Sequence, residues 1–72
     1  MKTALIFGLG RMGTAISYGM FNLGFNVHCA DKVPAQYKLK GLVDQARFTL
    51  IDDNTDAEAI IDKVNPDVVI SS

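Results

Sequence analysis

A glycine-rich segment near the start of the chain constrains the fold more than any other feature of the sequence. Gly8-Leu9-Gly10-Arg11-Met12-Gly13 matches the pattern G-x-G-x-x-G and directly follows the apolar run Thr3–Phe7. A continuous apolar run is typical of a strand buried on both faces, as in parallel sheets covered by helices. The segment therefore predicts a buried strand, a tight turn and a helix that begins among the glycines.

Each glycine of this segment has a distinct expected role. Gly8 permits the tight turn out of the strand, and Gly13 lets the helix lie close to the sheet. Gly10 has no Cβ, so a pyrophosphate group can approach the backbone. The N–H groups of Arg11 and Met12 are expected to point at the phosphates, where the helix dipole favours negative charge. The segment thus predicts a dinucleotide-binding β-α-β unit. The simpler alternative is a turn without a ligand.

The residues after this segment have the periodicity of an amphipathic helix followed by a strand. Apolar and small residues recur at i, i+3, i+4, i+7, i+8 and i+11, which predicts one buried stripe. Gly24 is expected to end the helix in the left-handed conformation. A second strand is predicted at residues 25–30, with Asp31 at its end. The expected stripe consists of Met12, Ala15, Ile16, Gly19, Met20 and Leu23.

The rest of the chain continues this alternation of strands and helices. Thr55 with Glu58 three residues later matches a capping box, and Asn65-Pro66 is expected to end the helix that it opens. The expected stripe of that helix is Ala57, Ile60, Ile61 and Val64. The expected elements are a turn at 32–34, a helix over about 35–43, a strand at 47–51, a loop at 52–54, a helix from about 55 and a strand at 67–70.

This order of elements is β-α-β-α-β-α-β, which predicts an α/β fold. Right-handed crossovers give four parallel strands in the order 3-2-1-4 with helices on both faces, a partial Rossmann (doubly wound) fold. Residues 1–72 would form one truncated domain: the first β-α-β-α-β half plus one helix and one strand. The fourth strand would then have one unpaired edge. We expect this edge to mediate self-association or contact with a partner chain, or the strand to be partly disordered.

Asp31 is the expected partner of an adenosine ribose. It stands 21 positions after Gly10, close to the spacing of about 20 residues at which an acid binds the ribose hydroxyls. A carboxylate accepts hydrogen bonds from both hydroxyls and repels a 2′-phosphate, which favours NAD over NADP. Lys32 and Arg11 leave NADP open, because either cation can reach a 2′-phosphate. The alternative for Asp31 is an ordinary turn residue at a strand end.

Three further residues at expected carboxyl ends of strands are candidate cofactor contacts. Asp52 or Asp53 could accept a hydrogen bond from the adenine amino group, or both could be loop residues that favour the next helix. Ser71, with Ser72 beside it, is expected near the middle of the cofactor, or at a frayed end. The run of residues 52–56 lacks the glycine and the spacing of a calcium loop, so no metal site is expected.

Three other residues invite a chemical interpretation but favour a structural one. His28 lies within the second expected strand, away from the carboxyl ends where a catalytic base would stand, and is expected to be a core or interface histidine. Cys29 is expected to be a small buried hydrophobe. Tyr18 has no lysine at helical spacing and is expected to be a surface or packing residue.

Composition excludes several classes of partner. Seven basic and eight acidic residues give a net charge of −1 with no block of either sign, so neither nucleic acid nor a membrane surface is an expected partner. The single cysteine allows no internal disulfide, which fits a reducing compartment. The apolar start meets Arg11 too early for a secretion signal. No apolar stretch approaches the roughly 18 residues that span a bilayer. We therefore expect a cytoplasmic protein.

The whole chain resembles the cofactor-binding part of saccharopine dehydrogenase-like oxidoreductases. The resemblance is carried by the glycine segment, by Leu50-Ile51-Asp52-Asp53, by Thr55-Asp56 and by Asn65-Pro66-Asp67-Val68-Val69-Ile70-Ser71-Ser72. The same glycine segment is also found in 6-phosphogluconate and 3-hydroxyisobutyrate dehydrogenases. The pattern is similar, too, to the nucleotide-sensing domains of potassium-uptake regulators.

The resemblance implies an NAD(P)-binding function without supplying catalytic residues. Enzymes of this type continue into further strands and a substrate domain, so no catalytic residue is carried over and no turnover is expected from 72 residues. The alternatives are a regulatory module that senses NAD(H) or ATP and a vestigial fragment without ligand affinity.

Overall fold

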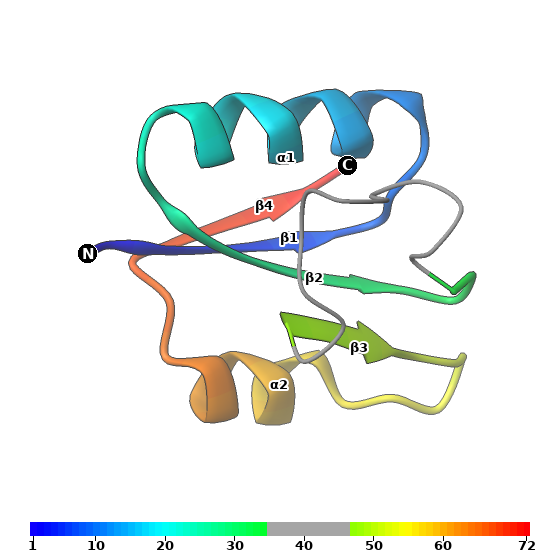
Figure 1. Cartoon of the computed structure of the whole chain (residues 1–72). Coiled ribbons are helices and arrows are strands. Elements are labelled where there is room, and N and C mark those ends of the chain that lie inside the picture. Colours follow the sequence, from blue (N-terminus) through cyan, green and yellow to red (C-terminus); the bar gives the residue numbers. More distant parts are fainter. Residues whose placement is uncertain (35–46) are drawn as a thin grey trace.

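A parallel four-stranded sheet forms the centre of the molecule. The computed structural model describes residues 1–34 and 47–72. The strands are β1 (Thr3–Phe7), β2 (Asn26–Asp31), β3 (Phe48–Leu50) and β4 (Val68–Ser71), and they lie side by side in the order β3-β2-β1-β4 (Figure 1). All three strand pairs are parallel. The predicted fold class and the predicted strand order are therefore confirmed. The first and last residues of each strand agree with the prediction to within one residue.

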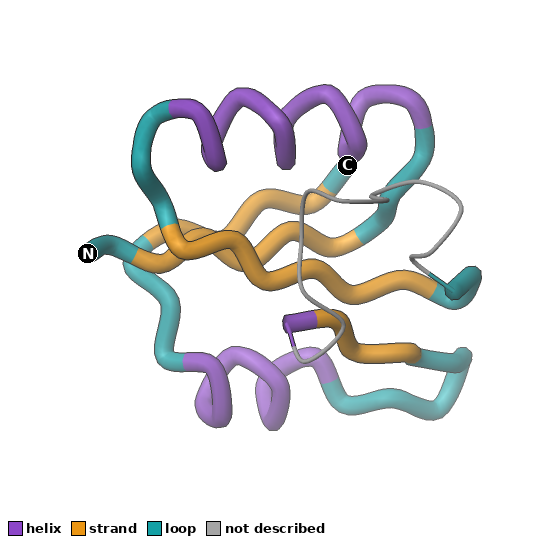
Figure 2. Tube along the Cα trace, in the orientation of Figure 1, coloured by secondary structure: helices purple, strands orange, loops and turns teal. Residues whose placement is uncertain are grey.

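Within residues 1–34 and 47–72, two helices lie on opposite faces of this sheet. Helix α1 (Arg11–Asn22) connects β1 to β2, and helix α2 (Ala57–Val64) connects β3 to β4. Figure 1 shows α1 and α2 on opposite sides, and Figure 2 shows the loops that join them to the strand ends. The helix predicted over about residues 35–43 lies outside the described residues.

The main hydrophobic core lies between α1 and the sheet. Its fully buried members are Ile6, Leu9, Val27 and Cys29. Ile16 and Met20 of α1 pack against them together with three residues outside α1, which are Phe25, Phe48 and Ile70. The core thus draws on all four strands, with two side chains from β2 and one from each of the other three.

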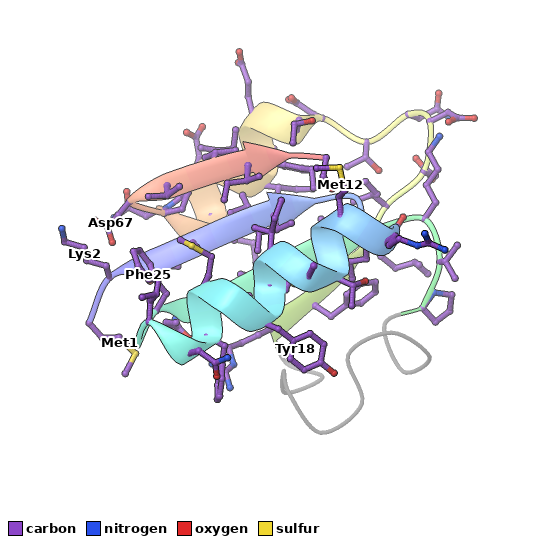
Figure 3. The ribbon with its side chains drawn as sticks, turned by 90° about the horizontal axis from the view of Figure 1, so that it is seen from above. Met1, Lys2, Met12, Tyr18, Phe25 and Asp67 are labelled. Carbon is purple, nitrogen blue, oxygen red and sulfur yellow. The ribbon has the colours of Figure 1, made fainter. Side chains whose placement is uncertain are left out.

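The buried stripe of α1 differs from the predicted one. Ile16 and Met20 face the core as predicted, but the other buried positions are Gly13 and Ser17. Met12 is 71% exposed and Leu23 75% exposed, and Ala15 and Gly19 are exposed as well. Figure 3 shows Met12 and Tyr18 on different sides of the helix, both away from the core. The predicted stripe is therefore correct at Ile16 and Met20 and wrong at its other four positions, because the small residues Gly13 and Ser17 are the ones buried beside them.

Helix α1 packs tightly against the turn after β1 at Gly13. A Cβ on Gly13 would lie 1.9 Å from the carbonyl oxygen of Gly8, which is backbone and has little freedom to move. One turn later, the buried Ser17 hydroxyl donates to the Gly13 carbonyl at 2.7 Å. Gly8 itself has φ +87°, a left-handed conformation that glycine adopts without steric cost. The predicted roles of these two glycines, the tight turn and the close helix packing, are confirmed.

Both ends of α2 are capped, but the N-terminal cap is not the predicted residue. The N-cap is Asp56, whose Oδ1 accepts from the N–H of Glu58 at 3.0 Å. Thr55, the predicted cap, instead donates through Oγ1 to Asp52 Oδ1 at 3.1 Å within the preceding loop. An aspartate caps a helix as well as a threonine does, so the capping-box prediction was wrong by one residue. Asn65, at φ 52°, ends the helix in the left-handed conformation, as the predicted stop requires.

Most of the predicted stripe of α2 is found. Ile60 is buried and Ile61 and Val64 are partly buried, whereas Ala57 is exposed.

Replacing Gly13 by alanine tests the close contact. The added methyl group must displace backbone, so Gly13→Ala is expected to lower the free energy of unfolding by about 3 kcal/mol or more, a large part of the margin of roughly 5 kcal/mol for a chain of this size. Gly19→Ala is the matched control, because a Cβ there has nothing within 4 Å. It is expected to raise stability by about 0.5–1 kcal/mol through helix propensity. Urea unfolding followed by circular dichroism measures both, and equal stabilities would contradict the contact.

The outer edge of β4 gives a second prediction. In the described part of the chain, β4 hydrogen-bonds only to β1, and Val69 on it is 45% exposed. Unpaired strand edges favour edge-to-edge association. We therefore expect concentration-dependent dimerisation of the 7.8 kDa chain in sedimentation equilibrium, and its loss in Val69→Lys. Leu23→Lys adds the same charge on α1 and should not affect the dimer. A monomer at all concentrations would contradict this expectation.

Candidate functional site

The predicted ribose-binding acid lies beside the glycine segment. Oδ2 of Asp31, at the end of β2, accepts from the backbone N–H of Leu9 at 2.9 Å. Oδ1 accepts from the N–H of Lys32 at 2.6 Å. The Leu9 contact joins residues 22 positions apart in the sequence. A carboxylate and the glycine turn therefore share one edge of the sheet, where the carboxyl ends of β1 and β2 meet.

The glycine segment leaves open backbone at the start of α1. Gly10 is the N-cap residue of the helix, has no side-chain cap, and is followed by no acidic residue in the first turn. A Cβ on Gly10 would meet nothing within 4 Å, so the space above this backbone is open. The first N–H groups of a helix lack partners within it and favour a negatively charged ligand. The arrangement can bind a phosphate, and a side chain at position 10 would fill that space.

Arg11 and Met12 stand in this first turn with exposed side chains. The backbone is held from below by Thr14, whose N–H donates to the Gly10 carbonyl at 2.9 Å. The Thr14 hydroxyl donates to the Leu9 carbonyl at 3.1 Å. Thr14 thus holds the backbone of the glycine turn from the helix side, while the space on the other side of Gly10 stays open.

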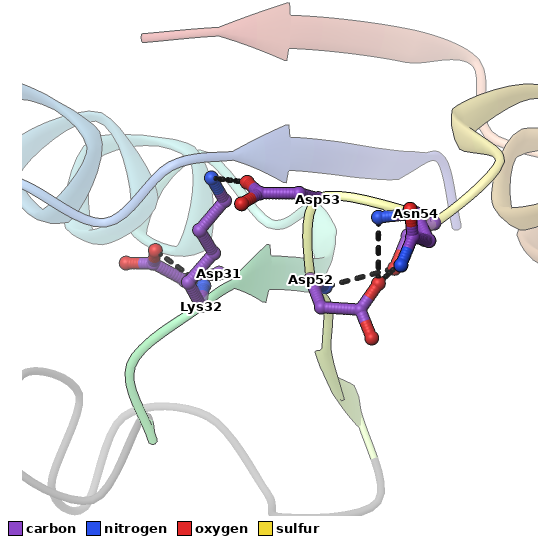
Figure 4. Close-up of polar contacts among 6 residues, drawn as sticks. Asp31, Lys32, Asp52, Asp53 and Asn54 are labelled. Carbon is purple, nitrogen blue, oxygen red and sulfur yellow. Dashed lines mark hydrogen bonds and ion pairs between the residues drawn. The ribbon is translucent and has the colours of Figure 1, made fainter.

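The two predicted adenine-side acids have different surroundings (Figure 4). Asp53 forms an ion pair with the ammonium group of Lys32. Asp52 Oδ1 accepts from the N–H of Asn54 at 2.9 Å and from the Thr55 hydroxyl. Asp52 therefore shapes the loop after β3, while Asp53 reaches across to the end of β2. A hydrogen bond from adenine to either carboxylate remains a prediction.

The contact between Lys32 and Asp53 shifts the titration of both groups. The hydrogen bond and charge of Asp53 raise the pKa of Lys32, and the nearby carboxylates of Asp31 and Asp52 add to this shift. The same contact lowers the pKa of Asp53. Both side chains are largely exposed, at 60% and 85%, so water screens the pair and its contribution to stability is small.

The serine that touches the glycine segment is Ser72 rather than Ser71. Ser71 pairs with Phe7 in the register of β4 against β1 and is exposed. The Ser72 hydroxyl donates to the Gly8 carbonyl at 2.7 Å, and a Cβ on Gly13 would lie 2.5 Å from this oxygen. The alternation of side chains along a strand, which puts neighbours on opposite faces, was the signal that could have distinguished the two. The predicted cofactor contact of Ser71 remains a prediction.

The residues expected to be structural have structural surroundings. Cys29 is fully buried, its Sγ lies 3.5 Å from the Ser17 hydroxyl, and burial raises the pKa of the thiol. Tyr18 is 41% exposed on α1. His28 is partly buried, with Nε2 at 3.0 Å from the Thr49 hydroxyl. Burial lowers the pKa of His28, and the positive charges of Lys63 and Arg47 lower it further.

The lowered pKa of His28 predicts a pH dependence of stability. Below its ordinary pKa of 6.5 the unfolded chain binds more protons than the folded one, so the free energy of unfolding falls as the pH drops from 6.5 toward the folded-state pKa. Urea unfolding between pH 7.5 and 5.5 measures this loss. His28→Gln, which does not titrate, is expected to flatten the profile in that range. An unchanged profile in the variant would contradict the role of His28.

Two further features bear on the classes of function. Within residues 1–34 and 47–72, no three His, Cys, Asp or Glu side chains are grouped in a way that could hold a metal ion. Neither α1 nor α2 combines the length and apolar character needed to cross a bilayer.

Comparison of the chain with protein families, with curated proteins and with solved structures finds no match.

Proposed function

We propose that this chain is the dinucleotide-binding portion of an oxidoreductase resembling saccharopine dehydrogenase, with NAD as its cofactor. The observation that carries the proposal is the position of the Asp31 carboxylate, hydrogen-bonded to Leu9 within the glycine turn. Because the adenosine ribose is bonded directly to the pyrophosphate, a carboxylate that binds this ribose must lie close to the amides that bind the pyrophosphate. The edge formed by β1, β2 and the start of α1 offers both groups together.

Two features of this edge support binding of the cofactor. The open backbone at Gly10 leaves room for a pyrophosphate, and the N–H groups of Arg11 and Met12 would donate to its oxygens. Asp31 would accept hydrogen bonds from the adenosine ribose hydroxyls. The nicotinamide, when bound, supplies the hydride chemistry. The proposal gives these residues binding and orientation, and it assigns no catalytic step to them.

Two alternatives use the same residues differently. A module that senses NAD(H) or ATP would bind at the same edge and pass a conformational signal to a partner. A turn without ligand affinity would keep the glycines for packing alone. The packing role of Gly13 serves all three hypotheses, whereas the open space at Gly10 has no packing function in the described residues. Gly10 is therefore the position at which ligand binding can be tested separately from folding.

Calorimetric titration of the 72-residue chain with NAD, NADP, ATP and AMP tests the proposal. NAD is expected to bind, and Gly10→Ala is expected to weaken it by roughly tenfold or more because the methyl group occupies the phosphate position. Asp31→Ala should weaken NAD similarly, since hydrogen bonds to a charged group are worth about 1.5–3 kcal/mol. Asp31→Asn keeps an acceptor for the Leu9 N–H, so it separates lost ribose contacts from a disturbed turn.

Gly19→Ala is the control, because it alters the same helix without touching this edge. Binding that is equal in wild type and Gly10→Ala would contradict the phosphate position. A preference for ATP would favour the sensing module, and no binding of any nucleotide would favour the turn without a ligand.

A further inference from the structure

An ion pair connects the ends of β2 and β3 next to the proposed ribose position. Lys32 directly follows Asp31, and its Nζ contacts Oδ1 of Asp53, 21 positions later in the sequence. Figure 4 shows the Lys32 side chain extending to Asp53, while its own backbone N–H donates to Asp31. The cation that directly follows the proposed ribose-binding carboxylate in the sequence is thus held by a second carboxylate from another loop.

More negative than positive charges surround this ion pair. Asp31, Asp52 and Asp53 are the three carboxylates whose charge acts on Lys32. Among these four side chains the negative charge exceeds the positive, and the single ammonium is already hydrogen-bonded. The ammonium of Lys32 is therefore directed to Asp53 and would have to leave this contact to pair with a ligand group at Asp31.

NAD and NADP differ at the ribose in a way that this arrangement of charges distinguishes. NAD presents a 2′-hydroxyl, which donates a hydrogen bond to a carboxylate. NADP presents a 2′-phosphate, which carries up to two negative charges and requires a nearby cation to accommodate it. We propose that Asp53, by holding Lys32 in this ion pair, selects NAD against NADP. This inference rests on the proposed binding of the dinucleotide at this edge.

The role of Asp53 is specific to its contact with Lys32. Asp52 has the same charge and lies one residue away, but its Oδ1 is bonded to Asn54 and Thr55 within its own loop. Removing the charge of Asp52 reduces the local negative potential and leaves the ion pair in place. Removing the charge of Asp53 also reduces this potential and, in addition, releases Lys32 from the ion pair. The two substitutions therefore separate a general charge effect from the release of Lys32.

Titration of NAD and NADP into wild type, Asp53→Asn and Asp52→Asn tests the inference. Asp53→Asn is expected to tighten NADP binding by about threefold to fivefold, because NADP no longer has to break an exposed ion pair worth up to about 1 kcal/mol. NAD binding is expected to change by less than about twofold. Asp52→Asn is expected to improve NADP binding much less. The double variant Lys32→Gln/Asp53→Asn should lose the gain, because the cation that the single variant releases is then gone.

The folded state of each variant is checked by circular dichroism, and these exposed side chains contribute little to stability. Equal gains in Asp53→Asn and Asp52→Asn, or a gain that persists in the double variant, would overturn the role of the ion pair while the cofactor site stands. A wild type that prefers NADP would overturn it as well. A wild type that binds neither dinucleotide would overturn the proposed function and this inference together.

Discussion

The contact between Gly13 and the carbonyl of Gly8 is the constraint on which the rest of the structure depends. No side chain fits between the helix and the turn at this point, so α1 lies directly against the end of β1. This position brings Ile16 and Met20 onto the core and sets the start of the helix at the sheet edge. A larger residue at Gly13 would push the helix outward, which would separate its first amides from β2 and open the main core.

Asp31 takes part both in the fold and in the proposed cofactor site. Its carboxylate contacts the glycine turn and the first residue after β2, so the group proposed to bind ribose also joins two segments of the fold. The neighbouring ion pair of Lys32 and Asp53 contributes little to stability, because both groups are solvated. Its proposed effect is on the charge that a ligand meets beside Asp31.

Regular features of the sequence predicted the fold, and contacts of individual side chains were harder to predict. Apolar runs and the glycine segment gave the four strands and their order, since burial of both faces leaves a plain pattern. The buried face of α1 was predicted only in part, at Ile16 and Met20, because hydrophobic periodicity does not detect small buried residues such as Gly13 and Ser17. The cap at Asp56, the contact of Ser72 and the pairing of Asp53 with Lys32 depend on loop geometry, where several polar neighbours compete for one position.

The burial of Cys29 provides a way to measure how often the hydrophobic core opens. The only thiol of the protein lies in β2, at the centre of the core beneath α1, and burial disfavours its reactive thiolate form. A thiol reagent can modify it only when α1 and the sheet move apart. The rate of that modification under native conditions thus measures how often the core opens, without any label introduced into the protein.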